Sequence, residues 1–544
     1  MPVESTFVVF RDVRRLRRVF TVALLVACGL SFSLPLTAQA GDYAQAEALV
    51  RNHQWDDGLA LVLRLLKTEP RNAKALNLAG LALTGRGDLQ QAGEYFRKCL
   101  IVAPGFVPAL KNLAINEFNQ KQYDGAEKHL QAALKGAPAD PVINLYLGEI
   151  AYRQHKYLAA ADALGRAPGF VARDENVAAH LAVSYLQTGK KQNALEILDR
   201  LTPEGVESQS QFALGLALAQ FDLPERSIPY LEAVRRRFPD SYDLAFDLVL
   251  TCIGAKDFSH AIQVGTDWIG RGHETTELDN LLAEAYEGDN QTQHAVDALR
   301  RAIALAPDDE DNYLDFASLC MNHRSYDAGL KVIQAGLQVH PKSDKLIFMR
   351  GVLYGMQDEY DLAEKDFQQA AYVAPQTNLG YVGLGVTYLE KGNASQAIQV
   401  LRQRLREKPN DASLLYLLGE ALLRNGAAPG QAAYNEAQAS LEKSVLLNPR
   451  LCLPHVSLGA IYLDEEKFKE AVDQFEQARA IDPQERSAYS HLAVAYKHLG
   501  QADKSRDVMT ALKDLISQER RATREKMKED AQSAAGDSQK STTH

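Results

Sequence analysis

Prolines recur every 34 residues along much of this 544-residue chain, and this period constrains the fold more than any other feature. Proline has no amide donor and turns the preceding residue away from helical angles, so each one marks a helix end. Extending the same step back from Pro307 reaches His273 and then Pro239, so the register survives where one proline is missing. The prolines that keep the spacing are Pro70, Pro104 and Pro138, then Pro307, Pro341, Pro375 and Pro409, then Pro449 and Pro483.

One repeat, residues 452–485, predicts two short amphipathic helices joined by a tight turn. Leu458, Gly459 and Tyr462 share one face of the first helix, because residues three and four apart lie on the same side. Ala471 and Phe475 share a face of the second helix in the same way. Since Gly459 and Ala471 lack bulk, we expect the two backbones to approach closely, with the aromatic rings filling the space beside the contact.

The register places unit starts at residues 39, 73, 107, 141, 175, 208, 242, 276, 310, 344, 378, 412, 452 and 486. Glycine, alanine or serine occupies the second small position of every unit, which supports the alignment. At the first small position only Val249 departs from glycine or alanine, which predicts looser packing in the unit that starts at 242. Residues 141–241 are the least regular, and a six-residue insertion falls in the turn at 426–430.

This repeat resembles the tetratricopeptide repeat, a helix-turn-helix module of about 34 residues. The resemblance implies an all-α, right-handed superhelical solenoid of tandem helix pairs. We divide the chain into a signal segment at 1–40, partly irregular repeats at 41–241, further repeats at 242–519, and a charged and polar tail at 520–544, disordered from about Asp530. The residues that carry the resemblance are Leu458, Gly459, Tyr462, Ala471, Phe475, Ala478 and Pro483.

The first forty residues have the pattern of an export signal. A basic stretch at 11–18 precedes an apolar stretch at 19–36, and the small-x-small sequence at 38–40 is a cleavage site. The stretch that ends at Cys28 also resembles a bacterial lipobox, in which the cysteine is acylated. Cleavage after Ala40, lipidation at Cys28 and an uncleaved anchor all remain open, and each predicts an exported protein, periplasmic or associated with the outer membrane.

Composition argues against nucleic acid as a partner. The net charge is -10, and removal of residues 1–40, which carry five arginines and two acidic residues, leaves -13. An acidic body of this kind repels phosphate backbones. The five cysteines include no CxxC pair, so we expect free thiols rather than disulfides or a zinc site.

No motif predicts a metal, a cofactor or a catalytic centre. His273 begins an HExxE sequence that lacks the second histidine of a zinc protease. The glycine spacing at 80–87 lacks the Lys-Ser/Thr of a phosphate loop, and Gly80 is already explained by close packing. The register from 39 to 519 also leaves no room for a separate catalytic domain.

The resemblance implies that the second, fifth, ninth and twelfth residues of each unit line a concave groove where partners bind. The groove is apolar in its C-terminal half, with an acidic step in the unit that starts at 276, and tight superhelical winding could instead bury the apolar stripe. Chaperone-binding members of the family hold a peptide's terminal carboxylate with a lysine, asparagine and arginine clamp. This sequence matches that clamp only in part, at Lys74, Asn77 and Lys111. The predicted groove residues are Phe246, Leu250, Ile253, Glu277, Asn280, Glu284, Glu287, Phe348, Val352, Val382, Val386 and Tyr416.

These observations predict a non-catalytic scaffold or adaptor in a bacterial cell envelope that binds a peptide segment or an amphipathic helix of other proteins. One alternative is a carbohydrate-binding solenoid in polysaccharide export, with Tyr381, Tyr388 or Tyr416 stacking on sugar rings. The other is an enzyme built on the solenoid, for which only the glutamates of the acidic step cluster. The oligomeric state stays open.

Overall fold

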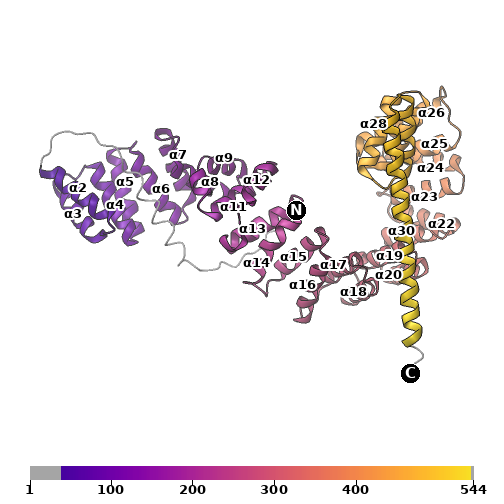
Figure 1. The fold of residues 1–544 in the computed structure, drawn as a ribbon, viewed down its shortest axis with the longest axis horizontal. Coiled ribbons are helices and arrows are strands. Elements are labelled where there is room, and N and C mark those ends of the chain that lie inside the picture. The colour runs from indigo at the N-terminus through magenta and orange to yellow at the C-terminus, as the bar shows by residue number, and fades with distance from the viewer. Residues whose placement is uncertain (1–37, 541–544) are drawn as a thin grey trace. The chain divides into compact units, whose positions relative to one another are not determined.

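The structure, a computed structural model, describes residues 38–540, and these residues form helices joined by turns, with no strand (Figure 1). They divide into two compact units, one up to His273 and one from Glu274 onward. The sequence boundary at 241/242 falls one repeat earlier. The helix pair at 242–270 belongs to the first unit, where α15 packs on α14.

The helices of the N-terminal unit are α2 Ala38–Arg51, α3 Trp55–Thr68, α4 Ala73–Arg86, α5 Leu89–Val102, α6 Val107–Asn119, α7 Tyr123–Gly136, α8 Pro141–Arg153, α9 Tyr157–Gly165, α10 Pro168–Val171, α11 Glu175–Gln187, α12 Lys191–Leu198, the short 3-10 helix η2 Pro203–Gly205, α13 Ser208–Gln220, α14 Pro224–Arg235, α15 Tyr242–Gly254 and α16 Phe258–Gly270. The C-terminal unit contains α17 Thr276–Gly288, α18 Thr292–Leu305, α19 Glu310–Asn322, α20 Tyr326–Val339, α21 Asp344–Gly355, α22 Tyr360–Val373, α23 Leu379–Glu390, α24 Ala394–Glu407, α25 Ala412–Arg424, α26 Ala432–Leu447, α27 Cys452–Asp464, α28 Phe468–Ile481, α29 Arg486–His498 and α30 Ala502–Lys540.

The helix starts confirm the predicted register and the all-α solenoid of helix pairs. In every unit the first helix begins within one residue of the predicted start. The insertion lies where it was expected, because α25 ends at Arg424 and α26 begins at Ala432. Within residues 38–540 no helix is long and apolar enough to span a bilayer. The predicted signal segment, its cleavage site and Cys28 lie outside the described residues.

Small residues in the first helix lie against large residues in the second, at positions 8 and 24 of a unit. A Cβ atom built on Gly80 would lie 2.3 Å from the Phe96 ring, and one on Gly459 would lie 2.6 Å from the Phe475 ring. Gly351 has the same relation to its own phenylalanine, at 2.7 Å. All three units with phenylalanine at position 24 therefore carry glycine at position 8, because a methyl group there would overlap the ring.

The unit that starts at 242 reverses this arrangement, and its two helices contact each other less extensively than those of most other units, in line with the expected looser packing. Val249 at position 8 is fully buried, and α15 packs on α16. Position 24 of this unit is Gly265, which is also buried. The bulk that other units place on the second helix is thus carried by the first helix in this unit.

A residue with a left-handed backbone occupies position 15 of each unit, in the turn between the paired helices. Glycine serves this role in five units, for example Gly87 with φ 90°. In the other nine the residue has a side chain, although left-handed angles are unfavourable for residues that carry a Cβ. These nine are His53, Lys121, His155, Asp222, Lys256, Asn290, Arg324, Asp358 and Glu466.

Glycine at one of these turns should stabilise the protein. Lys256 is exposed, with φ 59°, so Lys256→Gly removes the conformational strain without loss of packing. We expect the free energy of unfolding to rise by about 0.5–1 kcal/mol, the left-handed penalty less the entropy cost of glycine. Urea denaturation of the full chain measures this change. Lys256→Ala, which retains the Cβ, should leave stability unchanged, and an equal gain for both variants would contradict the explanation.

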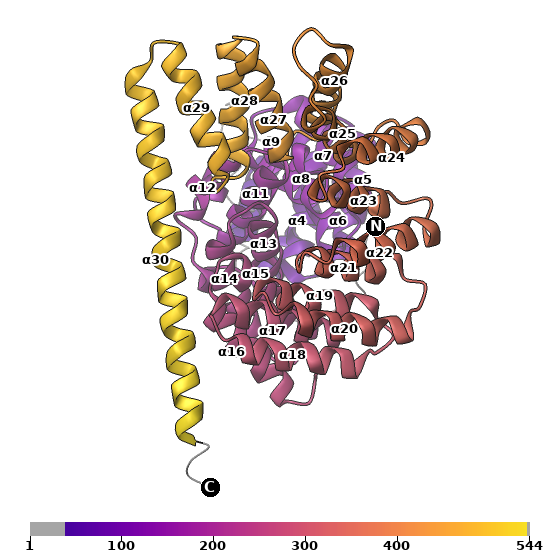
Figure 2. The same cartoon turned by 90° about the vertical axis from the view of Figure 1, so that its right-hand side faces the viewer.

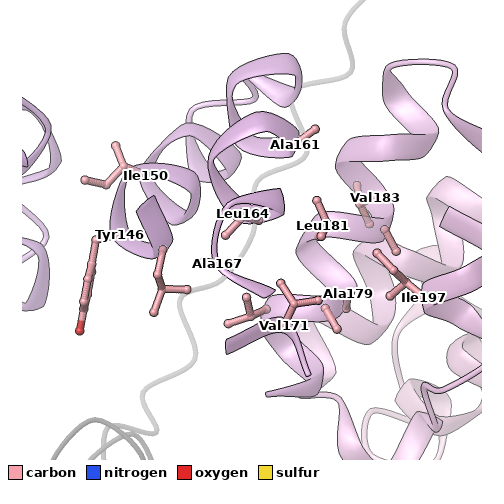
Figure 3. Close-up of a cluster of buried hydrophobic side chains, with 14 of the residues drawn as sticks. Tyr146, Ile150, Ala161, Leu164, Ala167, Val171, Ala179, Leu181, Val183 and Ile197 are labelled. Atoms are coloured by element: carbon pink, nitrogen blue, oxygen red, sulfur yellow. The ribbon is translucent and has the colours of Figure 1, made fainter. Parts of the chain in front are cut away.

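Residues 141–241 are irregular, as predicted. The second helices α9 and α12 are short, and α10 and η2 lie in the connections that follow them. The first helix α11 therefore contacts α9 and α13 directly. Side chains from α8 to α12, among them Ile150, Leu164, Val171, Leu181 and Ile197, still form one buried apolar cluster (Figure 3).

The last helix, α30, packs on α29 and continues to Lys540 (Figure 2). The charged helical continuation was predicted, but the tail was expected to lose regular structure from about Asp530. Residues 531–540 include three alanines and two glutamines, which favour helix.

The cysteines of the repeats are free thiols, as predicted. Cys99, Cys252 and Cys320 are buried and Cys452 is half-buried. Burial raises the pKa of Cys99 to about 11 and that of Cys252 to about 12, so both remain protonated at neutral pH. They pack as small apolar residues.

Candidate functional site

The first helices of successive repeats form one continuous surface in the C-terminal unit. Contacts join α19 to α21, α21 to α23, α23 to α25, α25 to α27 and α27 to α29. In Figure 2 the helix pairs of this unit follow an arc, with α21, α23 and α25 on its inner side and α20, α22 and α24 on its outer side. We call the first-helix surface the inner face.

Five predicted apolar residues lie together on this inner face: Phe348 and Val352 of α21, Val382 and Val386 of α23, and Tyr416 of α25, here named the apolar stripe. Except for Val386, they pack at the edge of one core cluster and are half-buried. Val386 is 44% exposed. Within this unit Val386 is therefore exposed, and the other four side chains keep only part of their surface accessible.

The predicted acidic step lies on α17, and its four residues differ in what they contact. Asn280 donates a side-chain hydrogen bond to Asn312, at 2.9 Å, and Glu287 Oε1 lies 2.6 Å from His323 Nε2. These two residues are engaged in contacts between repeats. Glu277 and Glu284 are exposed, and the described residues offer neither of them an ion-pair or hydrogen-bond partner. Two of the four thus remain available to a ligand.

A further carboxylate, Asp315 of α19, belongs with them and was not predicted. Burial raises the pKa of Asp315, and the charges of Asp311, Asp309 and Glu284 raise it further. We name Glu277, Glu284 and Asp315 the acidic patch. Sequence reasoning missed Asp315 because it is the sixth residue of its unit. The groove was predicted only at the second, fifth, ninth and twelfth residues.

The remaining predicted groove residues lie on α15, in the N-terminal unit. Leu250 is 49% exposed, Phe246 is half-buried beside the Tyr242 ring, and Ile253 is buried. Leu250 and Phe246 are accessible, whereas Ile253 is core. The structure therefore brings together the residues of α17 to α25 and leaves those of α15 in the other compact unit.

Beside Leu250, the carboxyl group of Asp247 is unfavourably placed. Burial, together with the charge of Asp243, raises the pKa of Asp247 to about 6. Because this pKa exceeds the unfolded value, the charged group opposes folding at neutral pH; the penalty shrinks as pH falls through 6 and is lost only below the unfolded pKa of about 4. Asp247→Asn should raise stability at pH 7 by about 1 kcal/mol and leave it nearly unchanged at pH 4. Urea denaturation at both pH values measures this, and a loss of stability at pH 7 would contradict it.

The N-terminal unit carries a buried polar chain that the sequence did not predict. His180 Nδ1 lies 2.8 Å from Glu149 Oε1, and His180 Nε2 lies 2.9 Å from the Ser210 hydroxyl. This is the order of a hydrolase triad. All three side chains are buried, however, and the Tyr152 ring stacks on the imidazole at 4.1 Å. The chain joins three successive repeats and holds them in register, without giving a substrate access to the serine.

Two of the clamp-like residues are also occupied. The Lys111 amine donates to Asp140 at 2.8 Å, and Asn77 accepts a hydrogen bond from Asn112 at 3.0 Å. Both interactions join first helices to neighbouring repeats or turns. Neither side chain is free to hold the carboxylate of a peptide.

The tyrosines proposed for sugar stacking have other roles. Tyr388 is buried, as predicted, and its hydroxyl donates to Glu364. The Arg404 guanidinium lies over the Tyr381 ring at 4.6 Å, so one face of that ring is covered. Tyr416 belongs to the apolar stripe. Within residues 38–540 no three metal-ligating side chains are grouped to hold an ion.

Known proteins share these repeats. Family models described as tetratricopeptide repeat match residues 43–105 and 382–443, residues 83–143 and 462–522, and residues 280–313. Combined with the repeat register and the helix pairs, these matches show that the chain belongs to the tetratricopeptide-repeat family.

Individual relatives are distant. Cellulose synthase operon protein C of Pseudomonas fluorescens is 26% identical over 477 residues, 80% of this chain and 36% of that protein. A BBSome complex member BBS4 homolog of Drosophila melanogaster is 23% identical over 199 residues, 36% of this chain and 40% of that protein. The chain thus covers two fifths or less of both. The solved structure of yeast Tom70 is 16% identical, with 88% of this chain and 92% of that chain covered and a TM-score of 0.40.

Proposed function

We propose that this protein is a protein-protein interaction scaffold and that its partner-binding surface is the inner face of the C-terminal unit. Tetratricopeptide-repeat proteins generally bind other proteins and generally lack catalytic activity of their own. The observation that carries the proposal is the apolar stripe, which extends across three successive first helices and keeps Val386 44% exposed. An apolar surface of this kind suits an amphipathic helix or an extended segment.

The N-terminal inner face supports this assignment by contrast. Its polar groups hydrogen-bond to one another across repeats, as in the chain through His180. Such groups are already satisfied and contribute to the rigidity of the array. The C-terminal inner face also has polar contacts between repeats, such as Asn280 with Asn312, but in addition it presents the apolar stripe and carboxylates without a partner among the described residues.

For the setting, we propose a bacterial cell envelope. The basic and apolar pattern of residues 11–36 supports export. The similarity to a protein named for a cellulose synthase operon supports a role near polysaccharide synthesis or export. Fractionation of cells that express the full chain, with immunodetection in cytoplasmic, periplasmic and membrane fractions, tests this proposal. Recovery in the cytoplasm alone would overturn it.

A crosslinking pull-down from cells tests the binding surface. We would compare the wild type with Val386→Lys, a substitution at a half-exposed side chain of the apolar stripe that should tolerate the change. We expect the wild type to capture a defined set of proteins that the variant loses. Capture of the same set by both proteins, with the variant shown to fold, would place binding elsewhere.

A further inference from the structure

We propose that the partner segment carries lysine or arginine residues in one part and apolar residues in the other, with the cationic part over α17 and α19 and the apolar part over α21 to α25. This inference rests on the proposed function and specifies the chemistry of the partner. It is carried by the order in which the acidic patch and the apolar stripe follow one another along the inner face.

The acidic patch lacks cations of its own. Nearby, Arg301 pairs with Glu274 and Asp279, and Lys345 pairs with two other carboxylates. These pairs leave Glu277, Glu284 and Asp315 without an opposite charge among the described residues. The negative charge of Glu284 raises the pKa of Asp315, and a cation that enters beside Asp315 offsets this repulsion. A bound lysine or arginine supplies that charge.

The apolar stripe, in contrast, has little net charge beside it. Arg424 lies between Glu390 and Glu420 and pairs with both, and Glu420 also accepts a hydrogen bond from the Ser457 hydroxyl. Apolar side chains of a partner can therefore cover Phe348, Val382 and Val386 without burying an unpaired charge.

The spacing sets a minimum length for the segment. The helices α19, α21, α23 and α25 contact one another in sequence. Packed helices lie about 8–10 Å apart, so Asp315 of α19 and Tyr416 of α25 are roughly 25–30 Å apart. An extended chain advances about 3.3 Å per residue, so about eight or nine residues span the distance. A dodecamer is long enough to contact both.

A random dodecamer peptide display library, panned against the full chain, tests the proposal. We expect enriched peptides with at least two Lys or Arg residues in one half and apolar residues in the other. The best peptide is then measured by fluorescence anisotropy with a Glu277→Gln, Glu284→Gln, Asp315→Asn variant. We expect at least a tenfold loss of affinity, smaller at high salt. The matched control also removes three carboxylates, but from turns and second helices, and should bind the peptide normally. Its substitutions are Glu359→Gln, Glu470→Gln and Asp473→Asn.

The outcomes separate this inference from the proposed function. Peptides that lose affinity with Val386→Lys but bind the neutralised variant normally would overturn the cationic partner and leave the inner face as the binding surface. Peptides that bind both variants normally would overturn both proposals. Enrichment of acidic peptides, or equal losses in the neutralised and control variants, would also overturn the cationic partner.

Discussion

Arg350→Leu should lower the free energy of unfolding by about 3–5 kcal/mol, because it leaves a buried carboxylate without its partner. Arg350 donates two hydrogen bonds to Asp366, at 2.8 and 2.6 Å, and Asp366 is buried. Urea denaturation of the full chain measures the total effect. Since repeat arrays can unfold in parts, amide hydrogen exchange in α21 and α22 locates the loss.

The chain itself offers the control for this prediction. The next unit carries Leu384 and Val400 at the positions of Arg350 and Asp366. The double variant Arg350→Leu, Asp366→Val should therefore recover wild-type stability or exceed it by about 1–4 kcal/mol. A double variant no more stable than Arg350→Leu alone would contradict this account. It would show that the unpaired carboxylate of Asp366 does not cause the loss of stability.

Gly459→Leu should destabilise the chain by about 1–3 kcal/mol through overpacking. Even a Cβ atom at this position would lie 2.6 Å from the Phe475 ring. The loss should appear as faster hydrogen exchange in α27 and α28. Gly459→Ala combined with Phe475→Leu should be tolerated better than Gly459→Ala alone, because alanine and leucine stand together at these positions in the unit that contains Ala114 and Leu130. Equal stability of wild type and Gly459→Leu would contradict the packing argument.

The repeat period was enough to predict the helix starts, the turn insertion and the fold. These features depend on prolines, glycines and small residues whose effects are local and recur in every unit. The positions of the groove residues came from the resemblance to the tetratricopeptide repeat, and the residues of the apolar stripe were among them. Local patterns of this kind are visible in a single sequence.

What the sequence missed depends on pairs of residues in different helices or repeats. The small residue that accompanies Val249, Gly265, was not paired with it because it lies on the other helix of the unit. The chain through Glu149, His180 and Ser210 advances by three fewer positions in each successive repeat, so no single unit contains it. Contacts of this kind could be found by comparing polar residues in neighbouring units, rather than within one unit.

Site-specific photocrosslinking at Val386 tests most directly whether the inner face binds proteins. A photoreactive amino acid replaces Val386 of α23, and in a second variant it replaces Asp473, an exposed residue of the second helix α28. After irradiation of cells that express the full chain, we expect discrete adducts to other proteins from position 386 and few from position 473. Adducts from position 473 with none from position 386 would show that the partner binds elsewhere.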